Sequence, residues 1–94
     1  MSAPEFPPAL VDLQKRSDAA WDAVEAHRKT VDESRREAAG GGPLRPWTAD
    51  QDAEHGRLLA AAREAAEGLR AGVLAAGLTA DYATTQGLKD AARA

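Results

Sequence analysis

The chain has 94 residues, which allow one small domain, and a net charge of −3, which argues against a general nucleic-acid binder because such proteins neutralise phosphates. The absence of cysteine excludes disulfides and thiolate chemistry. No basic segment followed by an apolar run opens the sequence, and its most apolar stretch, residues 71–80, is too short to span a bilayer. We therefore expect a cytoplasmic protein with no membrane partner.

The apolar residues are small, so the core is expected to be weak. Alanine supplies most of the 44% hydrophobic content, and the large aliphatic residues are nine leucines and four valines, with no isoleucine. Burying a leucine-sized side chain contributes only ~1.5–3 kcal/mol, and alanine much less. This inventory predicts self-association or a partner. The excess of arginine over lysine and the absence of isoleucine and asparagine indicate a GC-rich, bacterial genome.

A first long helix is predicted over about residues 8–39, after a flexible tail at residues 1–7, and residues 8–94 form one helical domain. Pro7 and Pro8 suit a helix start, because proline at the first helical position loses only an unpaired amide. Apolar and small residues then alternate at steps of three and four, which is a heptad seam: Leu10, Leu13, Ser17, Ala20, Val24, His27, Val31, Ser34 and Ala38. Opposite charges four residues apart flank it: Asp12–Arg16, Glu25–Lys29 and Asp32–Arg36.

A second long helix is predicted over about residues 48–76. Three glycines and two prolines in residues 40–46 end the first helix, and Thr48 with Gln51 forms a capping box for the second. Gly77 suits the left-handed position after its end, with Leu78 folding back. Two length-matched amphipathic helices joined by a short loop pack antiparallel, so the expected fold is an all-α hairpin.

The second helix carries two adjoining seams. The first runs through His55, Leu59, Ala62, Ala66, Leu69, Val73 and Ala76. The second consists of smaller residues that favour close approach of another helix. Glycine at positions 68 and 72 costs ~1 kcal/mol each in a helix interior, so a packing role is expected. We predict dimerisation into a four-helix bundle through this seam and Trp21, with these interface residues: Trp21, Leu58, Ala61, Ala65, Gly68, Gly72 and Ala75.

A short third helix is predicted over about residues 79–93. Thr79 is its expected N-cap, with Leu78 and Ala83 as a hydrophobic staple. Tyr82 and Leu88 are the residues expected to dock it against the hairpin.

The two histidines are the candidate metal ligands. Aligning the two long helices around residues 43–44 places His27 and His55 on facing seams about one turn (~5.4 Å) apart. The segment from Asp52 to His55 faintly resembles the Glu-x-x-His element of ferritin-like di-metal bundles, which implies a site using His27 and His55 with Asp52 and Glu54. Asp stands where that family has Glu, and the motif occurs once, so we expect no cofactor and no metal.

Surface residues point to binding more than to catalysis. Trp21 lies beside the first seam, and Trp47 precedes the second helix, where it either anchors a partner or closes the hairpin end. Basic residues lie on one side of the first helix: Lys15, Arg16, Arg28, Lys29, Arg35 and Arg36. Acidic residues form a stripe on another side: Asp18, Glu25 and Asp32. This arrangement of charges is typical of a solvent-exposed helix. No catalytic motif is present. The expected function is a non-enzymatic interaction module that binds itself and another protein; the alternatives are the bundle metalloprotein and a nucleic-acid-associated regulator.

Overall fold

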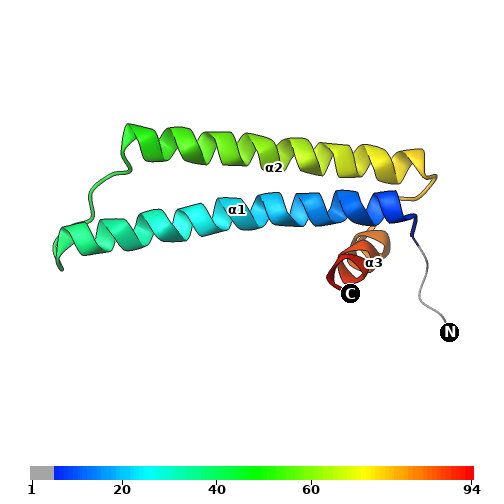
Figure 1. Cartoon of the computed structure of the whole chain (residues 1–94), viewed down its shortest axis with the longest axis horizontal. Coiled ribbons are helices and arrows are strands. Elements are labelled where there is room, and N and C mark those ends of the chain that lie inside the picture. Colours follow the sequence, from blue (N-terminus) through cyan, green and yellow to red (C-terminus); the bar gives the residue numbers. More distant parts are fainter. Residues whose placement is uncertain (1–5) are drawn as a thin grey trace.

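The computed structural model describes residues 6–94, and within them it contains three helices and no strand: α1 (Pro8–Ala39), α2 (Ala49–Ala75) and α3 (Tyr82–Arg93). α1 and α2 lie side by side and run antiparallel, while α3 packs on α1 at the end opposite the connecting loop (Figure 1). The predicted all-α hairpin with a short C-terminal helix is confirmed. The molecule is elongated, with extents of 56 × 26 × 19 Å.

The ends of α1 follow from proline and glycine. Pro8 occupies the first turn, and Gly40 ends the helix in the left-handed conformation (φ 54°), its amide donating to the Arg36 carbonyl. The heptad seam faces α2 as far as Val31, and three of its members are buried: Leu10, Ser17 and Val31. Its last two members, Ser34 and Ala38, are exposed, because the chain beyond them turns away into the loop.

The predicted signals at both ends of α2 are confirmed. The Thr48 hydroxyl accepts from the Gln51 amide at 3.1 Å, and the Gln51 side chain accepts from the Thr48 amide at 2.9 Å, which completes the capping box. Arg35 ties the loop to α1 by donating to the Arg45 carbonyl at 2.6 Å. After α2, Gly77 is left-handed (φ 75°) and the Leu78 amide donates to Val73 at 3.1 Å, so Leu78 folds back as predicted.

α3 begins later than predicted, and its cap is Asp81, not Thr79. The Asp81 carboxylate accepts from the Thr84 amide at 2.8 Å, while the Asp81 amide donates to the Thr79 carbonyl, so Thr79 belongs to the turn before the helix. Leu88 is buried (1% exposed) and docks α3 as expected. The prediction for Tyr82 is wrong: it is 82% exposed, because six residues of helix turn it about 120° away from Leu88.

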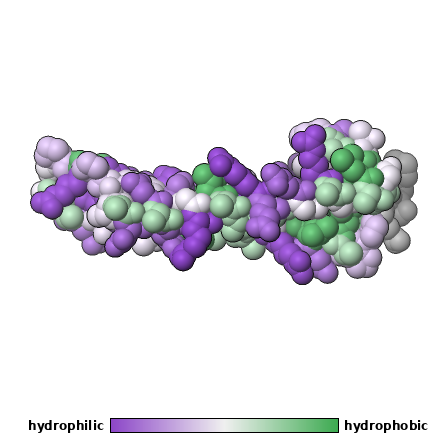
Figure 2. Space-filling model, turned by 90° about the horizontal axis from the view of Figure 1, so that it is seen from above, coloured by the Kyte–Doolittle hydropathy of each residue, from purple (hydrophilic) through white to green (hydrophobic). Residues whose placement is uncertain are grey.

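The hydrophobic core lies where the three helices meet. Leu10, Val73 and Leu88 are buried there, and partly buried apolar residues surround them: Phe6, Val11, Leu13, Leu69 and Leu78. Figure 2 shows apolar side chains gathered at this end, while the rest of that face is mostly hydrophilic. Toward the loop, the buried hydrophobic residues within residues 6–94 are Val31 and Ala62 alone. The hairpin is therefore well packed at one end and thin along the remainder.

Phe6 packs onto α3 beside a helical glycine. A Cβ added to Gly87 would lie 2.9 Å from the Phe6 ring, so the missing side chain makes room for it. The predicted flexible tail covered residues 1–7; residues 1–5 lie outside the described part of the chain, and Phe6 belongs to the packed core. No helix in residues 6–94 combines the length and the apolar content that crossing a bilayer requires.

Candidate functional site

Part of the predicted interface lines an open hollow between α1 and α2. We call it the Gly68 groove; its volume is about 300 Å³, and it is lined by Leu13, Arg16, Ala61, Glu64, Ala65 and Gly68. No atom lies within 4 Å of a Cβ built on Gly68. Nothing in residues 6–94 therefore requires glycine at this position, and this face of α2 has room for another helix.

Gly72 has a different role, because it faces the interior of the hairpin. A Cβ at this position would lie 2.7 Å from Leu13 Cδ1 and 3.2 Å from Leu10 Cδ1. Carbon atoms in contact are normally ~3.5–4.0 Å apart, so glycine here allows α1 and α2 to pack closely. Of the remaining predicted interface residues, Leu58 is half-buried and Ala75 is exposed.

Trp21 does not share a surface with the Gly68 groove. Five residues of helix separate it from Arg16, which turns the two side chains about 140° apart around α1. Trp21 is 42% exposed and lines a second hollow of about 450 Å³ between α1 and α3, with these residues: Lys15, Asp18, Ala19, Asp22, Lys89, Ala92 and Arg93. The predicted interface set therefore divides into two separate surfaces.

The histidines meet near the loop end of the hairpin, as the alignment of the seams predicts. The ring centroids of His27 and His55 are 6.1 Å apart, and the Trp47 ring meets them edge-on at 5.8 Å and 5.2 Å. We call His27 and His55 the histidine pair. Trp47 is half-buried, so of its two predicted roles the structure supports closing the hairpin end.

The carboxylates of the metal-bundle alternative do not join the histidine pair. Asp52 is exposed, and Glu54 forms an ion pair with Arg57 on its own helix. Within residues 6–94 no group of three or more His, Cys, Asp or Glu side chains is placed to hold a metal ion. A ferritin-like site, which needs several carboxylates, does not fit this arrangement.

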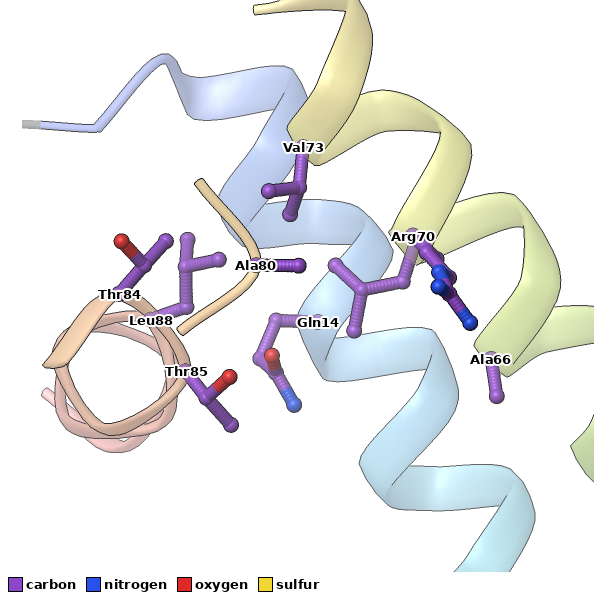
Figure 3. Close-up of a pocket in the computed structure, with 9 residues that line it drawn as sticks. Gln14, Ala66, Arg70, Val73, Ala80, Thr84, Thr85 and Leu88 are labelled. Atoms are coloured by element: carbon purple, nitrogen blue, oxygen red, sulfur yellow. The ribbon is translucent and has the colours of Figure 1, made fainter. Parts of the chain in front are cut away.

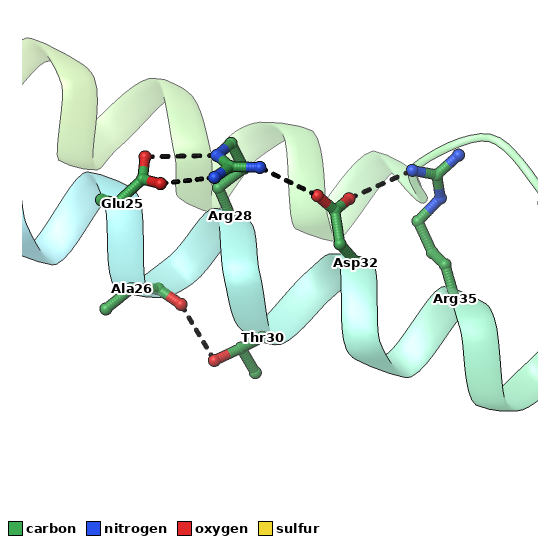
Figure 4. A network of polar contacts seen from close by, with 6 residues as sticks. All are labelled: Glu25, Ala26, Arg28, Thr30, Asp32 and Arg35. Carbon is green, nitrogen blue, oxygen red and sulfur yellow. Dashed lines mark hydrogen bonds and ion pairs between the residues drawn. The ribbon is translucent and has the colours of Figure 1, made fainter.

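Four charged residues of α1 form a chain of ion pairs along the helix: Glu25, Arg28, Asp32 and Arg35. Arg28 donates to Glu25 at 3.2 Å and to Asp32 at 3.1 Å, and Arg35 donates to Asp32 at 3.2 Å (Figure 4). The hydrogen bond from Arg28 lowers the pKa of Glu25, and the same bond raises the pKa of Arg28. The predicted partners of the two acids were Lys29 and Arg36. Arg28 and Arg35 pair with Glu25 and Asp32 instead, so this part of α1 carries charges of both signs.

A third hollow, which we call the three-helix groove, runs over α1 between α2 and α3 (Figure 3). Its volume is about 360 Å³, and it is lined by Gln14, Ala66, Leu69, Arg70, Val73, Ala80, Thr84, Thr85 and Leu88. The lining residues include no histidine, carboxylate, lysine or cysteine. The Asp81 carboxylate next to Thr84 caps α3, where it accepts from the Thr84 amide at 2.8 Å.

Gln14 is the site residue that the sequence reasoning missed. It is 3% exposed, forms the floor of the three-helix groove, and donates from Nε2 to Asp18 at 2.8 Å. A signal was present: Leu10, Gln14, Ser17 and Trp21 follow one another at steps of four, three and four. This second stripe on α1 marks the side that receives α3.

Comparison with protein-family models, curated proteins and solved structures finds no match to this chain.

Proposed function

We propose that this chain is a non-enzymatic helical interaction module that acts as a homodimer, with two hairpins packed into a four-helix bundle. The observation that carries the proposal is that the solvent-accessible surface of the chain is larger than that of a compact monomer. The chain exposes 6728 Å², whereas a compact monomer of this size exposes about 5,200 Å². The difference exceeds the ~800 Å² that one partner buries in a standard interface. The radius of gyration, 17.6 Å, also exceeds the ~12 Å of a compact domain of this length.

The Gly68 groove is the surface proposed to receive the second copy. Its small residues, Ala61, Ala65 and Gly68, let a helix of the partner approach closely. Arg16 and Glu64 give the groove one charge of each sign. In a two-fold interface, a contact from one residue to a second residue of the partner occurs twice, once in each direction. We therefore expect Arg16 of each protomer to face Glu64 of its partner. A self-complementary patch of this kind favours a second copy over an unrelated protein.

The composition of the three-helix groove supports a binding role over a catalytic one. The lining of the three-helix groove contains no base, and the histidine pair lies at the opposite end of the hairpin. The mixed charge along α1 gives no support to the nucleic-acid alternative, because Arg28 and Arg35 are engaged by Glu25 and Asp32.

Sedimentation equilibrium over a dilution series tests the proposal, with Gly68→Leu as the disrupting variant. Leucine is a good helix former, so α2 stays helical while the added side chain fills the groove. Gly56→Leu is the matched control: it is the same change on the same helix, also at a position with no atom within 4 Å. We expect a dimer for the native chain and for Gly56→Leu, and a monomer for Gly68→Leu. A native chain that is monomeric throughout, or a Gly68→Leu variant as dimeric as the native chain, would refute the proposal.

A further inference from the structure

The three-helix groove exists because α2 and α3 both lie on α1 with their backbones apart. Within residues 6–94, no Cα atom of α2 comes within 8 Å of a Cα atom of α3. The space between the two helices is about 360 Å³. Small-molecule sites in proteins are hollows of about 300–1,000 Å³ with a mostly apolar lining and a few polar groups. The groove is therefore large enough for one small ligand.

The lining of the groove has an apolar end and a polar end. Val73 and Leu88 lie at one end, where both are part of the hydrophobic core (Figure 3). The amide of Gln14 and the hydroxyl of Thr85 lie toward the other end in this view, and Arg70 extends from the α2 wall. A molecule that fills the groove therefore meets aliphatic side chains at one end and polar groups at the other.

Gln14 presents a hydrogen-bond acceptor to the groove. It is 3% exposed, and its Nε2 donates to the Asp18 carboxylate at 2.8 Å. Because a carboxylate only accepts hydrogen bonds, the amide nitrogen of Gln14 faces Asp18, and the amide oxygen, Oε1, faces away from it. Oε1 accepts no hydrogen bond from the residues that the structure describes. Buried polar groups nearly always have a partner, so Oε1 is the place where a donor of a bound molecule fits.

Arg70 supplies a positive charge to the same groove. It is the one charged residue among those that line it. The ion pairs within residues 6–94 leave Arg70 without a carboxylate partner. A guanidinium group binds a carboxylate through two parallel hydrogen bonds. The groove therefore combines a cation for a carboxylate, an acceptor for an N–H group, and an aliphatic surface.

We propose that the three-helix groove binds a free aliphatic α-amino acid such as leucine. The carboxylate of the ligand pairs with Arg70, and its ammonium group donates to Gln14 Oε1. The branched side chain of the ligand packs on Val73 and Leu88. Asp18 lies behind the Gln14 amide, and its negative charge favours the ammonium group at this position.

Titration of the isotope-labelled chain with L-leucine, followed by amide chemical shifts, tests the proposal. We expect saturable shifts among residues 80–88 of the α3 wall, and none at the histidine pair. Leucinamide lacks the carboxylate, and isocaproate lacks the amino group. Each is expected to bind about tenfold more weakly than L-leucine, or worse, because one charged hydrogen bond is lost. The lining shares no residue with the Gly68 groove, so the monomer and a dimer are expected to give the same result.

Substitutions assign the role of each group. Arg70→Gln is expected to weaken L-leucine binding about tenfold or more and to remove the preference over leucinamide. Gln14→Met, once circular dichroism has established that it is helical, is expected to lose the preference over isocaproate. Arg63→Gln is the matched control, because Arg63 is on the same helix but outside the groove, and it is expected to bind as the native chain does. The absence of saturable L-leucine binding up to about 10 mM, or equally tight binding by Arg70→Gln, would overturn the proposal.

Discussion

Gly68 and Gly72 lie one turn apart on α2, and alanine is expected to stabilise the fold at Gly68 but not at Gly72. Alanine is favoured over glycine in a helix interior by about 1 kcal/mol, and this gain applies at both positions. At Gly68 the new methyl group meets no atom of its own protomer within 4 Å, so a monomer keeps the gain. For a domain of this size it corresponds to a rise in melting temperature of about 4–8 °C.

At Gly72 the same methyl group must displace Leu13, whose Cδ1 would be 2.7 Å away, and Leu10, at 3.2 Å. Leu13 is half-buried and can move, but Leu10 is in the core at 3% exposed. Overpacking of a tight contact costs about 1–3 kcal/mol, which cancels or exceeds the helix gain. The expected result for Gly72→Ala is between no change and a loss of about 2 kcal/mol.

Urea denaturation followed by far-ultraviolet circular dichroism measures both variants, with Gly56→Ala as a reference. Gly56 is on the same helix, has no atom within 4 Å, and lies outside the Gly68 groove. In the dilute monomer Gly56→Ala and Gly68→Ala should both stabilise, and Gly72→Ala should not. If Gly72→Ala stabilises as much as Gly56→Ala, the close contact of α1 and α2 at Gly72 is refuted.

Three further outcomes are expected from the structure. Leu88→Ala should cost about 2–5 kcal/mol and release α3, seen as faster amide exchange in residues 82–93. The backbone hydrogen bond from Thr84 lowers the pKa of Asp81, so its stabilisation of α3 is complete above the ordinary carboxyl pKa and is lost as the pH falls through the lowered one. The protection of the α3 amides, which is their exchange rate relative to that of an unstructured peptide at the same pH, should therefore fall in acid, and Asp81→Ala should remove that dependence on pH. Reversing one charge of the Gly68 groove, by Arg16→Glu or Glu64→Arg, should weaken dimerisation in sedimentation, and the double reversal should restore it; a double variant as weak as the single ones would contradict an Arg16–Glu64 contact between protomers.

The long helices and their ends were predictable because local chemistry determines them. Proline at position 8, the left-handed Gly40, and the capping box of Thr48 and Gln51 each act within one turn of the chain. The start of α3 was harder. Thr79 and Asp81 are both good caps, and the choice depends on where the chain is free to become helical after Leu78 has returned to the core.

The roles of the remaining residues depend on tertiary contacts. The spacing of residues in a single sequence is compatible with more than one set of such contacts. Gly68 and Gly72 belong to one seam with regular spacing, yet Gly72 faces α1 and Gly68 faces open space. Which side of a two-seam helix meets its partner depends on rotation about the helix axis, which the spacing does not define. The meeting of His27 and His55 was predictable because it depends only on aligning two antiparallel helices around their loop.

The contact of Phe6 with Gly87 has a consequence for the order of folding. It closes about 80 residues of chain, whereas the hairpin closes through the loop at residues 40–48, so its loop-closure entropy is the larger cost. We expect α3 and Phe6 to dock last, onto a hairpin that already exists. A circular permutant that links residue 94 to residue 6 and opens the chain among the three loop glycines makes the α1–α3 contact local and the α1–α2 contact distant. In that permutant the three-helix end should form first, with the histidine pair brought together only in the final step.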